Sequence, residues 1–199
     1  MKNNYIGQAW LVLLLALAFG AALAAMQIKL GGRIEQNKEA DARTQIPDLV
    51  FAPGAEPPAF DVEKMTVEVT AGPRTVPYQT YKVTSADSGE LLGWVVKARG
   101  NGFADVIEVL IGLSPDASEI TGLYVLEQKE TPGLGDNITG DAWRGQFVGK
   151  SALTPVEIYK GTDSEPKNGV EAVTGATISS DSVAGIVNQT VERVRPELK

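Results

Sequence analysis

The stretch Thr174-Gly175-Ala176-Thr177-Ile178-Ser179-Ser180-Asp181 decides how the C-terminal part of the chain folds. After it, apolar residues recur three or four positions apart, which is typical of the buried face of an α-helix. They are Val183, Ile186, Val187, Val191 and Val194. Ser179, Ser180 and Asp181 are residue types that cap helix N-termini, and a helix N-terminus with free N–H groups can bind a phosphate. The stretch predicts a small-residue turn that enters a helix, and it leaves open whether the turn is an ordinary cap or also a binding site.

The middle of the chain consists of short β-type segments separated by turns. Residues 65–69 alternate between apolar and polar types, as a half-buried strand does. Further segments rich in Val, Ile, Leu and Tyr are found at residues 77–84, 90–98, 104–113, 120–128 and 156–159. Consecutive strands with short turns favour an antiparallel sheet.

The N-terminus carries an apolar segment without a charged residue between Asn3 and Ile28. About 20 apolar residues in a helix span the ~30 Å of a bilayer, so residues 1–28 are expected to form a transmembrane anchor. A cleavable signal peptide is the alternative, because Ala22-Leu23-Ala24 fits an A-x-A cleavage pattern. Residues 29–60 are expected to form a juxtamembrane helix and, from Ile46 to Phe60, a Pro-rich connector that is extended or rich in turns. The folded domain is expected at residues 61–199, and the charges around the span leave its orientation ambiguous.

Composition excludes several classes of function. The net charge is −7, which argues against nucleic-acid binding, since no basic face is present to neutralise phosphates. The chain has no Cys and no His, so it has no disulfide, no cysteine-ligated iron–sulfur cluster, no histidine metal ligand and no Ser-His-Asp hydrolase triad. No metal site is expected, and a redox cofactor would have to be an organic one held by hydroxyls, backbone and apolar contacts.

A second unusual stretch is Glu130-Thr131-Pro132-Gly133-Leu134-Gly135-Asp136. The Pro and the two Gly residues favour a tight loop, and Leu134 between the glycines either packs against a flat ring or fills the core. Trp143 and Phe147 are four residues apart on a short predicted helix, which favours a role in the core over contact with a ligand.

These two stretches resemble the paired signatures of the FMN-binding domains in Rnf-type complexes and in Na⁺-translocating NADH:quinone reductases, and most of all those of Rnf-type G subunits. The resemblance implies an α+β fold: one N-terminal transmembrane helix, then an FMN-binding domain with a twisted, mainly antiparallel sheet flanked by helices. It also implies that FMN is bound covalently, through a phosphoester to the hydroxyl of Thr177. The remaining cofactor-binding residues that it implies are Thr174, Gly175, Ala176, Glu130, Thr131, Gly133, Leu134 and Gly135.

The implied function is that of an electron-carrier subunit that is not catalytic alone. Its complex would couple electron transfer between ferredoxin and NAD⁺ to translocation of Na⁺ or H⁺. The implied partners are the other subunits of a membrane-bound complex and a Mg²⁺-dependent flavin transferase, because no His is available to activate the Thr hydroxyl. The implied location is the inner (cell) membrane, with the domain on the extracytoplasmic side. The sequence departs from the family at Glu171, where Asp is usual, and at Gln128-Lys129, where a His is frequent.

An alternative function remains open, namely a membrane-anchored sensory or scaffold module that binds flavin reversibly or not at all. In that case the hydroxyl of Thr177 has no special role.

Overall fold

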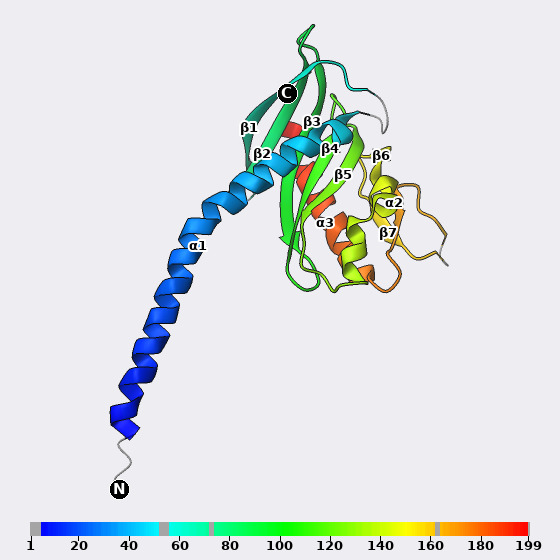
Figure 1. The fold of residues 1–199 in the computed structure, drawn as a ribbon. Helices are drawn as coiled ribbons and strands as arrows, with labels where there is room; N and C mark the ends of the chain where they lie inside the picture. Colours follow the sequence, from blue (N-terminus) through cyan, green and yellow to red (C-terminus); the bar gives the residue numbers. More distant parts are fainter. Residues whose placement is uncertain (1–4, 52–55, 72–73, 162–163, 199) are drawn as a thin grey trace. The chain divides into compact units, whose positions relative to one another are not determined.

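The computed structural model describes residues 5–51, 56–71, 74–161 and 164–198. The chain divides into two compact units, residues 1–41 and 42–199. Figure 1 shows the helices and strands in chain order.

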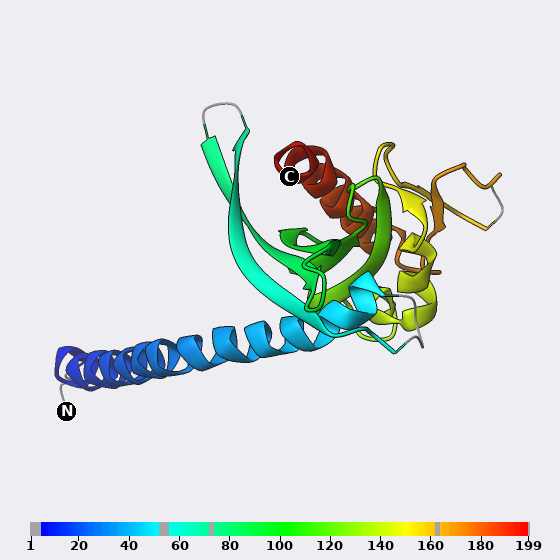
Figure 2. The ribbon, with the colours of Figure 1, turned by 90° about the horizontal axis from the view of Figure 1, so that it is seen from above.

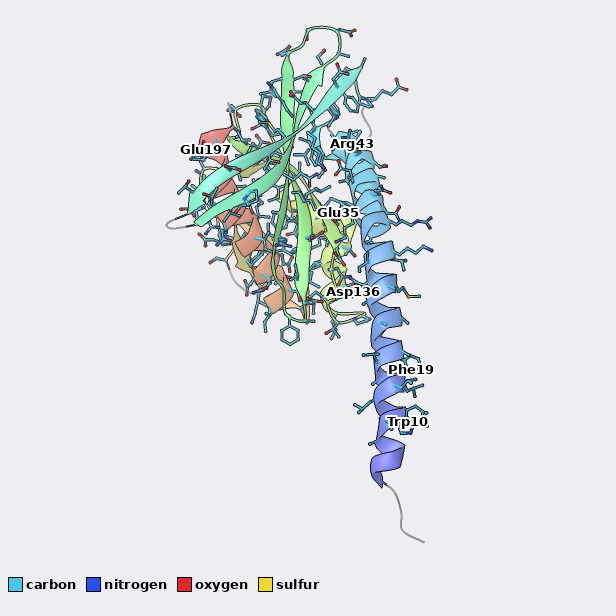
Figure 3. The ribbon with its side chains drawn as sticks, turned by 90° about the vertical axis from the view of Figure 1, so that its left-hand side faces the viewer. Trp10, Phe19, Glu35, Arg43, Asp136 and Glu197 are labelled. Atoms are coloured by element: carbon cyan, nitrogen blue, oxygen red, sulfur yellow. The ribbon has the colours of Figure 1, made fainter. Side chains whose placement is uncertain are left out.

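The first unit is the N-terminal part of α1 (Tyr5–Val50). It contains a stretch long and apolar enough to cross a membrane. Its large apolar side chains are exposed from Trp10 to Ile34. Figure 3 shows Trp10 and Phe19 on the apolar part of the helix, and Glu35 and Arg43 on the part that follows. This pattern fits a membrane anchor, because a bilayer supplies the apolar surroundings that such side chains require.

The second unit is built on a six-stranded antiparallel sheet in which each strand pairs with the next one in the sequence. The strands are β1 (Phe60–Ala71), β2 (Arg74–Ser85), β3 (Leu91–Asn101), β4 (Val106–Leu113), β5 (Glu119–Glu127) and β6 (Lys150–Ser151). The short strands β7 (Glu157–Tyr159) and β8 (Gly169–Glu171) form a separate parallel pair. The predicted antiparallel sheet is therefore confirmed.

Helix α3 (Thr177–Val194) covers one face of the sheet. Its buried face contains all five apolar residues that the sequence pattern predicted. They pack in one core with alternate residues of the central strands, such as Trp94 and Val96 of β3. Figure 2 shows the β1–β2 hairpin curving round the side on which α3 lies.

The opposite face of the sheet is covered by the last turns of α1, from Ala42 to Val50. Ala42, Ile46 and Leu49 are buried there against Tyr81, Val83, Val95 and Leu110. Side chains of a strand alternate between the two faces of its sheet, so Val95 belongs to this cluster while its neighbours Trp94 and Val96 face α3. The sheet is thus buried on both faces.

The expectation that residues 46–60 are extended or rich in turns is wrong for its first part. Helix α1 continues through Pro47 to Val50, and the compact unit begins at Ala42 instead of near residue 61. A Pro in a helix interior costs about 3 kcal/mol. Burial of Ile46 and Leu49, at about 1.5–3 kcal/mol for each side chain, offsets that cost.

The helix docks on glycines of the sheet. Gly112 and Gly122 are paired across β4 and β5, and a Cβ atom on either would meet the backbone of Leu49. The hydroxyl of Thr121 donates a hydrogen bond of 2.5 Å to the carbonyl oxygen of Leu49. One carbonyl at the C-terminus of α1 is therefore satisfied by the sheet itself.

Candidate functional site

One pocket brings together both of the unusual stretches of the sequence. Its volume is about 360 Å³, within the range of ~300–1,000 Å³ that is usual for small-molecule sites. Three segments that are distant in the sequence line it: Phe103, Thr131, Leu134, Gly135, Gly175, Ala176, Thr177, Ile178 and Ser179. A separate pocket of about 250 Å³, between α3 and residues 151–155, contains none of the predicted site residues.

The N-terminus of α3 lies at this pocket without a side-chain cap. Ala176 is the N-cap residue, and its side chain accepts no hydrogen bond. The first backbone bond of the helix runs from the N–H of Ser180 to the carbonyl of Ala176, at 3.0 Å. Within the part of the chain that the structure describes, the N–H groups of Thr177, Ile178 and Ser179 donate to no protein acceptor. These groups and the positive end of the helix dipole suit a phosphate.

The expectation that Ser179 or Ser180 caps α3 is wrong, because both residues lie inside its first turn and are buried. The hydroxyl of Ser180 donates to the carbonyl of Ala176 at 3.1 Å and accepts the N–H of Val173 at 3.0 Å. The hydroxyl of Ser179 donates to Glu130 at 2.6 Å. Both hydroxyls are thus used to attach the helix to neighbouring segments, and the N-terminus stays open.

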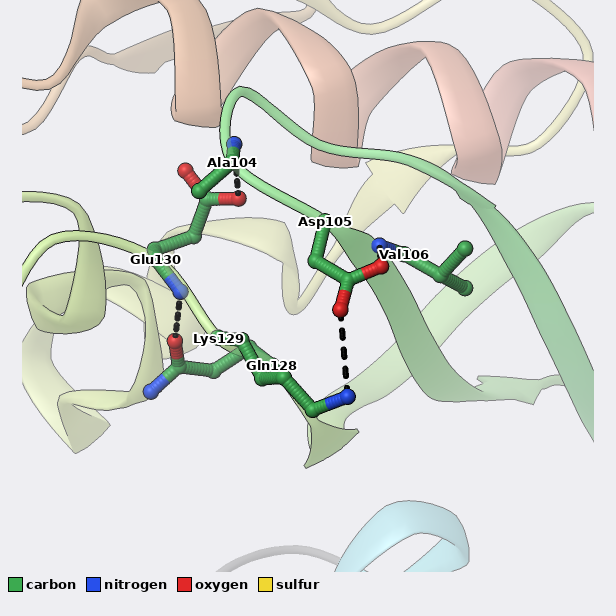
Figure 4. Close-up of polar contacts among 6 residues, drawn as sticks. All are labelled: Ala104, Asp105, Val106, Gln128, Lys129 and Glu130. Atoms are coloured by element: carbon green, nitrogen blue, oxygen red, sulfur yellow. Dashed lines mark hydrogen bonds and ion pairs between the residues drawn. The ribbon is translucent and has the colours of Figure 1, made fainter. Parts of the chain in front are cut away.

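Glu130 joins three segments beneath the pocket. Its side chain is only 4% exposed. One carboxylate oxygen accepts the Ser179 hydroxyl, and the other accepts the N–H of Ala104 at 3.1 Å. Its own N–H donates to the side chain of Gln128 at 2.6 Å, as Figure 4 shows. Glu130 therefore fixes the relative positions of the β3–β4 turn, its own loop and the start of α3.

The turn beside Glu130 is closed by an ion pair between Asp105 and Lys129, at 3.1 Å (Figure 4). The N–H of Val106, at 2.7 Å, and then the ammonium group of Lys129 hold the pKa of Asp105 below its usual value. Asp105 therefore stays ionised to lower pH than an unfolded Asp, which titrates near pH ~3.9.

Glycines let the loop approach the helix closely. A Cβ atom on Gly135 would lie 2.9 Å from the hydroxyl oxygen of Ser179, and one on Gly175 would lie 3.0 Å from the side chain of Leu134. Gly175 also has a φ of +79°, a conformation that other residues rarely adopt. Leu134 thus lies against the backbone of the small-residue turn and forms a wall of the pocket.

Six of the nine predicted cofactor-binding residues line the pocket: Thr131, Leu134, Gly135, Gly175, Ala176 and Thr177. Glu130 lies beneath it, and Gly133 and Thr174 lie outside its lining. Sequence reasoning missed Phe103, Ile178 and Ser179. Phe103 could have been noticed as an aromatic residue within the polar turn from Asn101 to Asp105.

Two other expectations concern residues outside the pocket. Trp143 and Phe147 are buried and pack edge to face, with ring centroids 5.3 Å apart, so the predicted role in the core is confirmed. Glu171 is exposed at the end of β8 and does not line the pocket.

The arrangement is suited to a phosphate-bearing ligand with an apolar ring. It offers free N–H groups and a hydroxyl at one helix end, together with exposed apolar side chains from Phe103, Leu134 and Ile178. Across the described residues, no three acidic side chains are grouped so that they could hold a metal ion. FMN has a phosphate and a flat ring, so the pocket fits this cofactor.

Comparison with known proteins also indicates a domain that binds FMN. Residues 102–192 match the family model of the FMN-binding domain, so this part of the chain is similar to FMN-binding domains. The matched segment begins at the β3–β4 turn and includes all the residues that line the pocket.

Particular relatives belong to ion-translocating complexes. The chain is 38% identical to the G subunit of the Na⁺-translocating ferredoxin:NAD⁺ oxidoreductase complex of Acetobacterium woodii, over 68% of this chain and 64% of the relative. It is 30% identical to the C subunit of the Na⁺-translocating NADH-quinone reductase of Neisseria meningitidis serogroup B, over 64% of this chain and 52% of that one. The chain thus spans less than two thirds of the length of these relatives.

The fold is also similar to a solved structure. NqrC of Shewanella oneidensis superposes with a TM-score of 0.55 and 29% sequence identity, over 63% of this chain and 62% of that one.

Proposed function

We propose that this chain is a membrane-anchored electron-transfer subunit whose FMN is attached by a phosphoester to the hydroxyl of Thr177. The observation that carries the proposal is the position of Thr177 as the first residue of α3, in the pocket that both motif loops form. Bound FMN supplies the redox chemistry. The proposed contacts are the six predicted residues that line the pocket, with Glu130 acting from beneath it.

Attachment requires a separate flavin transferase, which breaks the pyrophosphate bond of FAD, joins the FMN phosphate to the Thr177 oxygen and releases AMP. A Thr hydroxyl is a weak nucleophile unless a base removes its proton. The chain contains no His, and both carboxylate oxygens of Glu130 already accept hydrogen bonds from Ala104 and Ser179. The residues around Thr177 therefore present its hydroxyl but do not activate it.

The proposed setting is an Rnf-type complex that couples electron transfer between ferredoxin and NAD⁺ to Na⁺ or H⁺ translocation. Support comes from the relatives named above, which are subunits of such complexes and of Na⁺-translocating quinone reductases. The subunit acts as an electron relay between its neighbours in the complex, since electrons enter and leave by way of the FMN.

The mass of the intact, denatured protein tests the tether. Wild type, Thr177→Ala, Thr177→Ser and Thr174→Ala are each expressed together with the flavin transferase. Wild type and Thr174→Ala are expected to carry the added mass of one FMN less water, and Thr177→Ala is expected to carry none. Thr174 is the matched control, because it is an exposed Thr of the same motif that does not line the pocket.

An added mass on Thr177→Ala would place the attachment elsewhere. No added mass on wild type would overturn the tether and favour the sensory or scaffold function. Thr177→Ser retains a hydroxyl and is expected to be modified.

We also propose that the domain lies on the extracytoplasmic side of the membrane. The chain has no Cys, so a single Cys at the exposed Glu197 can be labelled without background. Glu197→Cys is expected to react with a membrane-impermeant maleimide in spheroplasts before lysis, whereas Lys2→Cys is expected to react only afterwards. The reverse pattern would place the domain in the cytoplasm.

A further inference from the structure

Phe103 is a solvent-exposed aromatic side chain at the edge of the pocket. It is 62% exposed, although it lies in a turn whose other side chains are small or polar. It lines the same pocket as Thr177 but comes from a different part of the chain, the turn between β3 and β4. An isolated exposed Phe needs no explanation, whereas one that lines a candidate cofactor pocket does.

The turn that carries Phe103 is fixed on both sides of this residue. The N–H of Gly102 donates to the carbonyl of Asp105 at 2.8 Å, and the N–H of Ala104 donates to Glu130 at 3.1 Å. A Cβ atom on Gly102 would collide with the Glu130 carboxylate. The backbone at Phe103 is thus held by the same carboxylate that anchors Ser179 in the first turn of α3.

Two more exposed apolar side chains line the pocket, and each comes from another segment. Leu134 is 47% exposed and Ile178 is 58% exposed. Together with Phe103 they surround the helix end that carries the Thr177 hydroxyl. Three such side chains around one pocket form an apolar site that a flat aromatic ring can fill.

We propose that Phe103 packs against the isoalloxazine ring of the FMN carried by Thr177. This inference rests on the proposed function and adds a ring contact to it. Aromatic rings attract one another in offset or edge-to-face contacts beyond the area that they bury. Phe103 acts as a positioning residue that keeps the tethered ring docked in the pocket and shielded from water.

The test measures how far the isoalloxazine ring is exposed to solvent. Wild type, Phe103→Ala, Phe103→Leu, Phe103→Tyr and Leu153→Ala are expressed in full length with the flavin transferase, and intact mass first establishes that each carries FMN. Quenching of the flavin fluorescence by iodide then reports exposure of the ring, and visible circular dichroism reports its asymmetric surroundings. Leu153 is the matched control, since it is 58% exposed and does not line this pocket.

Loss of an aromatic contact is expected to shift the ratio of docked to free ring by about two- to tenfold. Phe103→Ala should therefore be quenched more strongly by iodide and should show weaker visible circular dichroism than wild type. Phe103→Tyr and Leu153→Ala should match wild type in both measurements. Phe103→Leu should fall between wild type and Phe103→Ala.

Flavinylated Phe103→Ala with the iodide quenching and circular dichroism of wild type would overturn this inference and leave the tether intact. A wild type that carries no FMN would instead overturn the tether, and the inference with it. If Phe103→Ala is not flavinylated, Phe103→Leu is measured in its place, because it keeps an apolar side chain in the turn. Iodide quenching and circular dichroism equal to those of wild type in Phe103→Leu would then overturn the inference.

Discussion

A fragment that begins at Glu56 is expected to lose most of the stability of a fragment that begins at Lys38. The shorter fragment lacks Ala42, Ile46 and Leu49, which are at most 3% exposed. It also exposes the face of the sheet that they cover, formed by Tyr81, Val83, Val95 and Leu110. At about 1.5–3 kcal/mol for each large side chain, loss of Ile46 and Leu49 alone removes about 3–6 kcal/mol, which is a large share of the ~5–15 kcal/mol by which a domain is usually stable.

Urea unfolding followed by circular dichroism checks this result in both fragments. Two variants of the fragment 38–199 separate loss of packing from loss of chain length. Ile46→Ala should lower the free energy of unfolding by about 2–5 kcal/mol, whereas Asp48→Ala, on the exposed side of the same turn, should change it by less than about 0.5 kcal/mol. Equal stability of the two fragments would show that the end of α1 is not part of the folded core.

Gly112→Ala is expected to be among the most destabilising single substitutions in the domain. The added methyl group would collide with the carbonyl oxygen of Leu49 and would lie 2.7 Å from the hydroxyl oxygen of Thr121. The last turn of α1 would have to move away, and the hydrogen bond from Thr121 to Leu49 would break. Overpacking of a core costs about 1–3 kcal/mol and occasionally more. Because the collision here is with a backbone atom, the loss of stability should be at or above the upper end of this range.

Thermal unfolding of the fragment 38–199 measures the effect. A loss of about 3 kcal/mol corresponds to a fall in Tm of about 6–12 °C for a domain of this size. Gly185→Ala is the matched control, because Gly185 is exposed in α3 with no atom within 4 Å of an added Cβ. Gly185→Ala should raise stability by up to about 1 kcal/mol, and a Gly112→Ala variant as stable as wild type would contradict the docking described for α1.

The local pattern was sufficient to predict α3, because apolar residues recur along its one buried face, and apolar segments between turns were sufficient to predict the strands. The five apolar positions from Val183 to Val194 are a property of the helix alone. The end of α1 could not be predicted in this way. Pro47 signals a break, and only the sheet surface that buries Ile46 and Leu49 overrides that signal.

For the site too, features that depend on nearby residues could be predicted, and features that depend on residues distant in the sequence could not. Thr177 and the loop around Leu134 could be predicted from their own residues and from resemblance to a family. The role of Glu130 could not, since it depends on Ser179 and Ala104, which are distant in the sequence. Phe103 was missed for the same reason, because nothing next to it in the chain indicates that its turn reaches the start of α3.

The order of strands in the sheet has a consequence for when the cofactor can be added. Each strand from β1 to β6 pairs with its neighbour in the sequence, and contacts that are local in sequence favour rapid folding. Helix α3 follows all of these strands in the chain and packs across them, so we expect it to dock last. Thr177 would then reach its final surroundings only in the completed fold, and the proposed flavin transferase would act on folded molecules in preference to nascent ones.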